Sequence, residues 1–184
     1  AVVVVFCVVF AASVTAEAPA DGPGPDNSFI AFDSGLRRGE WSPDRQAELL
    51  AELGYDGIVY KGAHDIEKRL KALHERGLEL SALFSAVNLD EEGLEYPDLE
   101  RAMKKLEGTG ALIWLIVEGS DGGDRRAARI LRRLGRTAEE AGLRVAIYPH
   151  DNTYVETTLR GLKVARKTGR DNVGVSYNLC HSLK

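Results

Sequence analysis

Short apolar runs alternate with amphipathic stretches along the chain from about residue 28 onward, with a period of about 30 residues. Each apolar run is nearly continuous, which is typical of parallel strands that are covered on both faces. We therefore expect six strands, at Phe29–Phe32, Gly57–Tyr60, Leu78–Val87, Ala111–Val117, Arg144–Tyr148 and Val173–Tyr177.

The stretches between these runs place apolar residues at helical spacing and charged residues at the other positions. The first helix is predicted to begin after Ser42, a good capping residue, with Pro43 in its first turn. Further helices are expected over residues 65–76, 97–106, 124–141 and 155–167. Glycine follows several of these helices, where a left-handed residue can close the last turn, at Gly54, Gly77, Gly142 and Gly169.

Strict alternation of strand and helix predicts parallel βαβ units, in either an open doubly wound sheet or a (β/α)8 barrel. Residues 33–39, after the first strand, lack the glycine spacing of a dinucleotide-binding loop, and the sequence contains no Walker motif. We therefore predict an α/β fold of the TIM-barrel type. Because a full barrel has eight strands and ~250 residues, we expect these residues to form an incomplete barrel of about six βα units.

The N-terminal segment is expected to be a signal peptide whose own start is missing. An apolar run over Ala1–Phe10 leads into small residues that end at Ala16, and the segment carries no charge and is too short to span a bilayer. Cleavage after Ala16 would leave a linker over residues 17–27 and the partial barrel over residues 28–184. The protein would then be exported, periplasmic or secreted, without stable membrane association; an uncleaved segment that anchors it to the membrane is the alternative.

Composition and charge narrow the function. The chain is 44% hydrophobic and 28% charged, which is typical of a globular protein. A net charge of -4 with both signs mixed offers no basic stripe, so we expect no nucleic-acid partner. Loss of the leader would remove Cys7 and exclude an internal disulfide, and we expect the remaining Cys180 to be packed rather than reactive.

Three segments carry a resemblance to a known family: residues 50–58, Leu-Ala-Glu-Leu-Gly-Tyr-Asp-Gly-Ile; residues 146–150, Ala-Ile-Tyr-Pro-His; and residues 172–175 together with 178–181. From Phe29 to Lys184 the chain resembles the xylose isomerase-like TIM barrels. That family includes sugar phosphate isomerases and epimerases, with endonuclease IV as a distant member. The resemblance implies a metal-assisted proton or hydride shift on a sugar, at the carboxyl ends of the strands.

Two carboxylates of the family pattern are replaced. Tyr148 stands where the resemblance would place a metal-binding Glu, and Asn178 stands where it would place an Asp. His150 and His181 keep the histidine positions. The loss of two negative charges is expected to weaken a site for Mg or Mn, whereas His150 as a ligand would favour Zn. His150 and Asn178 are thus the candidate metal ligands, and metal dependence stays open, because the family's other ligands would follow Lys184.

The ends of barrel strands nominate further residues, because barrel enzymes place their chemistry in the loops that follow the strands. His150 and His181 are the candidate catalytic pair, since imidazole exchanges a proton near neutral pH. Glu118 is a third candidate, because burial would raise its pKa; simple acceptance of hydrogen bonds from loop amides is the alternative. The candidates for substrate binding are Asp33, Lys61, Asn88 and Trp41.

These features predict an exported sugar isomerase or epimerase that transfers a proton on a small sugar, assisted by a divalent metal if one is bound. The alternative is a non-catalytic carbohydrate-binding barrel that has lost the family's metal site, which the two neutral replacements suggest. A zinc nuclease is disfavoured, because two of the four histidines, His64 and His74, are expected on the outer helical ring.

Overall fold

The computed structural model describes residues 27–37, 39–120 and 123–183. The expected signal peptide and almost all of the expected linker lie outside these residues, so both stay predictions. No helix in the described ranges is long and apolar enough to cross a membrane.

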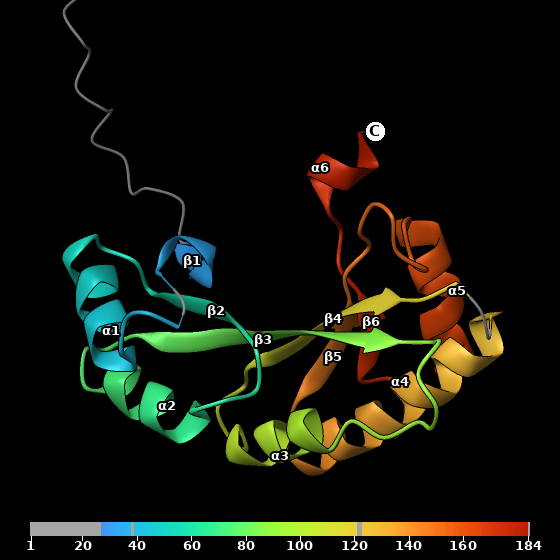
Figure 1. Cartoon of the computed structure of the whole chain (residues 1–184), viewed down its shortest axis with the longest axis horizontal. Coiled ribbons are helices and arrows are strands. Elements are labelled where there is room, and N and C mark those ends of the chain that lie inside the picture. The colour runs from blue at the N-terminus through green and yellow to red at the C-terminus, as the bar shows by residue number, and fades with distance from the viewer. Residues whose placement is uncertain (1–26, 38, 121–122, 184) are drawn as a thin grey trace, which may run out of the picture.

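Six parallel strands form one sheet in chain order, from β1 at one edge to β6 at the other. Helices α1 to α5 lie on the convex side of this curved sheet and leave its concave side open (Figure 1). A doubly wound sheet has helices on both faces, so this arrangement confirms the TIM-barrel-like α/β prediction. The strands are β1 (Ile30–Phe32), β2 (Gly57–Lys61), β3 (Glu79–Asn88), β4 (Leu112–Glu118), β5 (Arg144–Ile147) and β6 (Val173–Val175).

Five helices occupy the positions that the amphipathic stretches predict: α1 (Pro43–Glu52), α2 (Ile66–His74), α3 (Pro97–Lys105), α4 (Gly123–Glu140) and α5 (Thr158–Thr168). The Ser42 hydroxyl accepts a hydrogen bond from the Arg45 amide at 3.2 Å and caps α1 as expected. Two short elements were not predicted, the 3-10 turn η1 (Asp33–Gly35) and helix α6 (Leu179–Ser182). Both are too short to show a helical period in the sequence.

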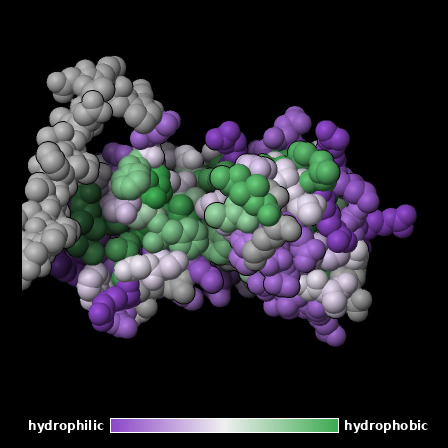
Figure 2. All heavy atoms as spheres, turned by 90° about the horizontal axis from the view of Figure 1, so that it is seen from above, coloured by the Kyte–Doolittle hydropathy of each residue, from purple (hydrophilic) through white to green (hydrophobic). Residues whose placement is uncertain are grey.

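The main hydrophobic core lies between the sheet and the helices. Its fully buried members include Leu83 of β3, Ile113 of β4, and Leu131 and Leu134 of α4. A smaller apolar cluster covers the concave side of the sheet, formed by Val59, Ala82, Phe84 and Ile116. Figure 2, which views the molecule from above, shows apolar residues gathered along the middle of this concave side.

Gly57 marks a close approach of two strands. It pairs with Glu79 at the start of the β2–β3 ladder. A Cβ atom at position 57 would lie 2.4 Å from the Glu79 carbonyl oxygen, which is closer than van der Waals contact allows. The glycine is therefore required here by space rather than by backbone conformation.

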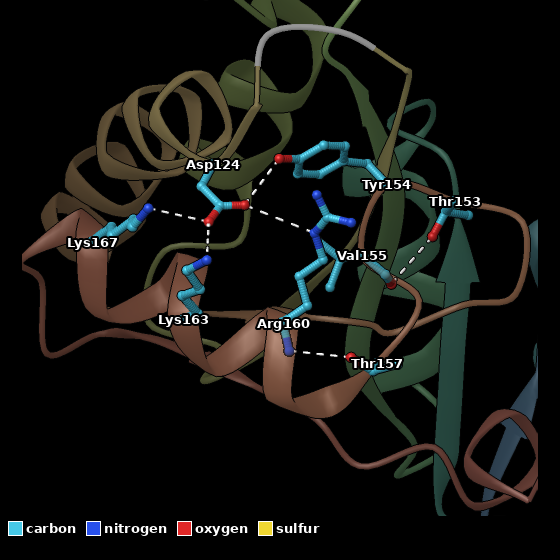
Figure 3. A network of polar contacts seen from close by, with 8 residues as sticks. All are labelled: Asp124, Thr153, Tyr154, Val155, Thr157, Arg160, Lys163 and Lys167. Atoms are coloured by element: carbon cyan, nitrogen blue, oxygen red, sulfur yellow. Dashed lines mark hydrogen bonds and ion pairs between the residues drawn. The ribbon is translucent and has the colours of Figure 1, made fainter.

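Asp124, near the start of α4, joins that helix to α5 and to the loop before α5 (Figure 3). Its carboxylate accepts a hydrogen bond from the Tyr154 hydroxyl at 2.9 Å and ion-pairs with Lys163 at 3.2 Å and Lys167 at 3.1 Å. Burial opposes ionisation of this group, but the hydrogen bonds from Lys167, Tyr154 and Lys163 outweigh it and lower the pKa to about 2. The carboxylate stays ionised throughout the physiological range, so the contact between α4 and α5 persists there.

Candidate functional site

The concave side of the sheet presents a connected series of aromatic rings. Phe32 and Phe84 have ring centres 5.3 Å apart, Phe84 and Trp114 lie 5.9 Å apart, and Trp114 and Tyr148 lie 4.5 Å apart. The series arises from strand geometry, because successive side chains point to opposite faces of a sheet. In β4, Ile113 therefore enters the helix-facing core, while Trp114 faces the concave side.

His150 and His181 meet at one end of this aromatic surface. Their ring centres are 4.1 Å apart, and the Tyr148 ring lies 5.9 Å from His150 and 6.3 Å from His181. His150 follows β5 and His181 lies in α6, after β6, so adjacent parallel strands deliver both rings to the same end of the sheet. The structure thus brings together the two residues that the sequence nominates as a catalytic pair.

The hydrogen bond of His150 indicates which of its nitrogens carries the proton. Nδ1 lies 2.8 Å from the carbonyl oxygen of Asp151. A carbonyl oxygen can only accept, so Nδ1 is assigned the hydrogen and donates it, which leaves the Nε2 of the neutral ring with a free lone pair. In His181, Nδ1 is buried and has no hydrogen-bond partner among the described residues. His150 therefore retains Nε2 for a bound molecule, whereas the unpaired Nδ1 of His181 is buried.

Asn178 positions the two histidines relative to each other. Its side chain is buried, its amide donates to the Pro149 carbonyl at 3.3 Å, and its Oδ1 accepts from the His181 backbone amide at 3.4 Å. Pro149 directly precedes His150, so one side chain ties together the segments that hold both rings. Asn178 thus has a clear positioning role in this structure.

Tyr148 supplies a neutral phenol where the resemblance would place a Glu. Burial raises the pKa of Tyr148, proximity to Cys180 raises it further, and a hydrogen bond with Asn178 lowers it in part. The net effect is a raised pKa, so the hydroxyl keeps its proton at neutral pH. It can therefore donate a hydrogen bond to an oxygen of a ligand but cannot act as a carboxylate would.

The predicted metal site has no complete set of donor side chains among the described residues. Within the described ranges, no group of three or more His, Cys, Asp or Glu side chains is placed to hold a metal ion. Of the two candidate ligands, Asn178 already has both ends of its amide in hydrogen bonds, and His150 would offer a single donor, its Nε2. These residues alone do not fit a metal centre, so a metal would need ligands beyond them.

Asp33 and Lys61 lie together at the ends of β1 and β2. The Asp33 side chain is fully buried, and its Oδ2 accepts a hydrogen bond from the Lys61 backbone amide at 3.1 Å. The Lys61 ammonium lies 5.9 Å from the centre of the Phe84 ring and so extends over the concave aromatic surface. Lys61 therefore places a positive charge beside this surface. Asp33 connects the ends of β1 and β2 through its hydrogen bond to the Lys61 amide.

The other predicted binding residues have structural contacts. Asn88 accepts a hydrogen bond from the Asp90 amide at 2.9 Å through its Oδ1, which forms a local turn. Trp41 is covered by the guanidinium groups of Arg37 and Arg45, whose carbons lie 5.8 Å and 5.7 Å from its ring centre. Neither residue contacts the aromatic series in this structure.

Two expectations about burial are wrong. Glu118 is exposed at the end of β4, so burial does not act on its carboxyl group as predicted. Its backbone carbonyl accepts a hydrogen bond from the Leu89 amide at 2.9 Å. Cys180 is exposed in α6 rather than packed. His64 and His74 are exposed, as predicted.

Trp114 and Ser176 also belong to the concave side, although the sequence pattern does not single them out. The Trp114 indole donates a hydrogen bond to the Ser176 hydroxyl at 2.7 Å, which links β4 to the end of β6 across the concave side. A tryptophan inside a predicted strand is a usable signal, because its N–H needs an acceptor when it is buried. The acceptor itself is distant in sequence and could not be identified from the pattern.

Comparison with known sequences identifies a family. Residues 47–184 match a family described as xylose isomerase-like TIM barrel. A search of curated proteins finds no match.

Comparison with solved structures gives the same fold at low sequence identity. A probable 3-DHS dehydratase from Bacillus anthracis matches with a TM-score of 0.66 and 15% identity, over 84% of this chain and 64% of that one. A 3-keto-D-glucoside 4-epimerase from E. coli matches with a TM-score of 0.64 and 16% identity, over 81% of this chain and 67% of that one. A protein called IOLI, solved with a zinc atom, matches with a TM-score of 0.65 and 17% identity, over 84% of this chain and 64% of that one.

The chain spans less than two thirds of the length of the dehydratase, at 64%. Identities this low establish a shared fold, and function has to be argued from the site.

Proposed function

Because the chain belongs to the xylose isomerase-like TIM barrel family, we propose that it acts on a small carbohydrate by proton transfer next to a carbonyl carbon. The observation that carries the proposal is the pair of imidazoles, His150 and His181, 4.1 Å apart at one end of an aromatic surface. Sugars present apolar C–H faces as well as hydroxyls, and aromatic rings beside a few polar groups suit such a ligand.

The roles follow from the hydrogen bonds of each group. His150 has a free lone pair on Nε2, because its Nδ1 donates to Asp151, and it is the group proposed to remove the proton. His181, whose ring centre lies 4.1 Å from that of His150, is proposed to return a proton or to bind the sugar oxygen. Tyr148, held neutral by its raised pKa, would donate a hydrogen bond to the carbonyl oxygen on which negative charge develops.

Two structural neighbours support the substrate class. One is named a 3-keto-D-glucoside 4-epimerase and another a probable 3-DHS dehydratase. The first name gives a keto-glucoside as the substrate of that protein, which supports a small keto sugar as the substrate class proposed here. A third neighbour was solved with zinc, which supports a metal as an optional partner of His150, with further ligands that the described residues do not supply.

Export is part of the proposal and rests on the N-terminal apolar segment alone. An exported protein would meet free or oxidised sugars rather than sugar phosphates. The proposed location is the periplasm or the medium, with membrane anchoring as the alternative if the segment is retained.

The test is isotope exchange in the full chain. Incubation with keto sugars in deuterated water, including a 3-keto-glucoside, should replace the hydrogen next to the carbonyl with deuterium, which NMR detects as loss of that C–H signal. His150→Gln and His181→Gln are each expected to slow exchange about 100-fold or more. His74→Gln, an exposed histidine on α2, is the matched control and should exchange at the wild-type rate. Exchange that persists in both site variants would refute the assigned roles.

A non-catalytic carbohydrate-binding barrel is the second candidate. The specific observation in its favour is that Tyr148 and Asn178 are neutral where the family resemblance would place carboxylates. In that case sugars would change the fluorescence of Trp114, which faces the concave side, while no deuterium enters the sugar. Binding without exchange across the keto sugars tested would favour this candidate over the enzyme.

A further inference from the structure

Helix α4 carries a row of arginines on its outer surface. Arg125, Arg129, Arg132 and Arg136 follow at intervals of four, three and four residues, so they share one face of the helix. The row extends over about 16 Å at the rise of an α-helix. The row is hidden in the sequence because charges of both signs are mixed along the chain, and the helix separates them.

Most of this charge is not neutralised. Arg125, Arg129 and Arg136 are exposed, and none of them has an ion-pair or hydrogen-bond partner within the described ranges. Neighbouring cations are different, because Arg133 pairs with Glu100 at 2.9 Å and Lys167 pairs with Asp124 at 3.1 Å. Carboxylates from α3 and α4 therefore serve the flanking residues and leave the row itself unpaired.

Arg132 is held in place by the end of α5. Its Nε donates to the Thr168 carbonyl at 2.6 Å, and one Nη donates to the Lys167 carbonyl at 3.0 Å. These bonds occupy neutral acceptors, so the positive charge remains available. A guanidinium that is already ordered loses less conformational freedom when it binds an anion than a free side chain does.

Two cavities lie along the row and share Arg129 and Arg132. The larger has a volume of about 760 Å³ and is lined by Arg125, Ala128, Arg129, Arg132 and Lys167. The smaller has a volume of about 350 Å³ and is lined by Leu94, Arg129, Arg132, Arg133, Arg136 and Arg170. Neither set of described lining residues includes an acidic side chain. We call the two together the α4 groove. Figure 2 shows that hydrophilic residues cover the end of the molecule that holds α4 and α5.

Like charges at intervals of three and four residues repel each other and destabilise a helix, so the arginine row lowers the stability of α4 when no anion is bound. An elongated ligand with several anionic groups would remove this repulsion. We propose that the α4 groove binds an acidic polysaccharide, a linear chain with a carboxylate on each sugar unit. Arginine suits this ligand because its planar guanidinium can donate two parallel hydrogen bonds to one carboxylate.

One observation favours a polysaccharide over a nucleic acid. No aromatic side chain is among the described residues that line the groove, whereas binding of single strands depends on stacking of bases. The choice of a sugar polymer also rests on the proposed function, and the groove would hold such a chain on the helical side, away from the imidazole pair.

The test measures binding of a fluorescently labelled galacturonate hexamer to the full chain by polarisation at low ionic strength. The triple variant Arg125→Gln, Arg129→Gln, Arg136→Gln is expected to bind about tenfold more weakly or worse, because three exposed charges are lost. The matched control changes the exposed Lys68, Lys71 and Lys104, on α2 and α3, to Gln and removes the same net charge. Its affinity should change less than about twofold, and added salt should weaken wild-type binding.

Three results would overturn the proposal. They are equal losses in the two triple variants, absence of wild-type binding to the hexamer, and tighter binding of a thymidine oligonucleotide with the same number of charges. Circular dichroism of both variants should match the wild type, because all six residues are exposed. Deuterium exchange is a separate readout. If the protein binds the hexamer but catalyses no exchange into keto sugars, the proposed function is refuted while binding of the polysaccharide in the α4 groove stands.

Discussion

Replacement of Asp124 by Asn should reveal how much one partly buried ion network contributes to stability. The Asp124 side chain is only 13% exposed and contacts Lys163, Lys167 and Tyr154 (Figure 3). Asn keeps the shape and one acceptor oxygen but removes the charge. Any loss of stability in this variant therefore reports mainly on the charged contacts between α4 and α5.

The pKa of Asp124 sets the magnitude. It falls from 3.8 to about 2 on folding, and at 1.36 kcal/mol per pKa unit the charged form stabilises the fold by about 2 kcal/mol above pH 5. A lowered pKa means that the unfolded chain takes up the proton first as the pH falls. The contribution is therefore complete above the unfolded value, shrinks to roughly 1 kcal/mol near pH 3, and is almost gone at pH 2.

Urea unfolding of the wild type and Asp124→Asn at pH 7 and at pH 3 measures this directly. The difference in unfolding free energy should be about 2 kcal/mol at pH 7 and about half of that at pH 3. Asp171→Asn, at an exposed aspartate, is the control and should change stability by less than about 0.5 kcal/mol at either pH. A difference for Asp124→Asn that is the same at both pH values would refute the electrostatic argument and assign the effect to packing.

Two further substitutions test the sheet. Gly57→Ala should lower the unfolding free energy in urea by about 1–3 kcal/mol, because its Cβ would lie 2.4 Å from the Glu79 carbonyl oxygen. The control is Gly174→Ala, in another strand, where a Cβ would meet nothing within 4 Å and stability should be unchanged or slightly higher. Equal effects of the two substitutions would contradict the steric argument. Trp114→Phe removes the hydrogen bond to Ser176 and should lower the unfolding free energy by about 1 kcal/mol, and an unchanged midpoint would show that this bond contributes nothing net.

The strands and helices were largely predictable, because a continuous apolar run and a helical period are strong local signals. The differences lie at the ends of elements. β5 ends at Ile147, one residue earlier than expected; the Tyr148 amide still donates to Leu115 of β4, and Pro149, which follows, has no amide hydrogen to continue the ladder. β6 ends at Val175, and the residues after it lead to Asn178, which caps α6. A four-residue helix is too short to show a helical period, so neither the helix nor its cap could be predicted from the sequence.

The site was predictable where topology alone decides the positions. His150 and His181 meet because adjacent parallel strands end at the same edge of the sheet. Glu118 shows where that rule stops: it ends a strand whose preceding residues are buried, yet its own side chain is exposed. Burial at a strand end depends on what covers it in three dimensions, and no pattern along the chain contains that information.

The aromatic surface could not be predicted for a different reason. In β4, apolar residues occupy both faces, so Trp114 and Ile113 look alike in the sequence although they face opposite sides of the sheet. The arginine row on α4 could not be predicted because positive and negative residues are mixed along the chain. Only the helical geometry places the four arginines on one face.

The unequal division of apolar burial between the two sides of the sheet has a consequence for how such a protein evolves. The largest fully buried side chains, such as Leu83, Ile113 and Leu134, belong to the helix-facing core, while the concave cluster is small and partly open. Substitutions on the concave side therefore remove few packing contacts. A lineage with this architecture can therefore change a concave residue such as Tyr148 while its capacity to fold is inherited from the other side.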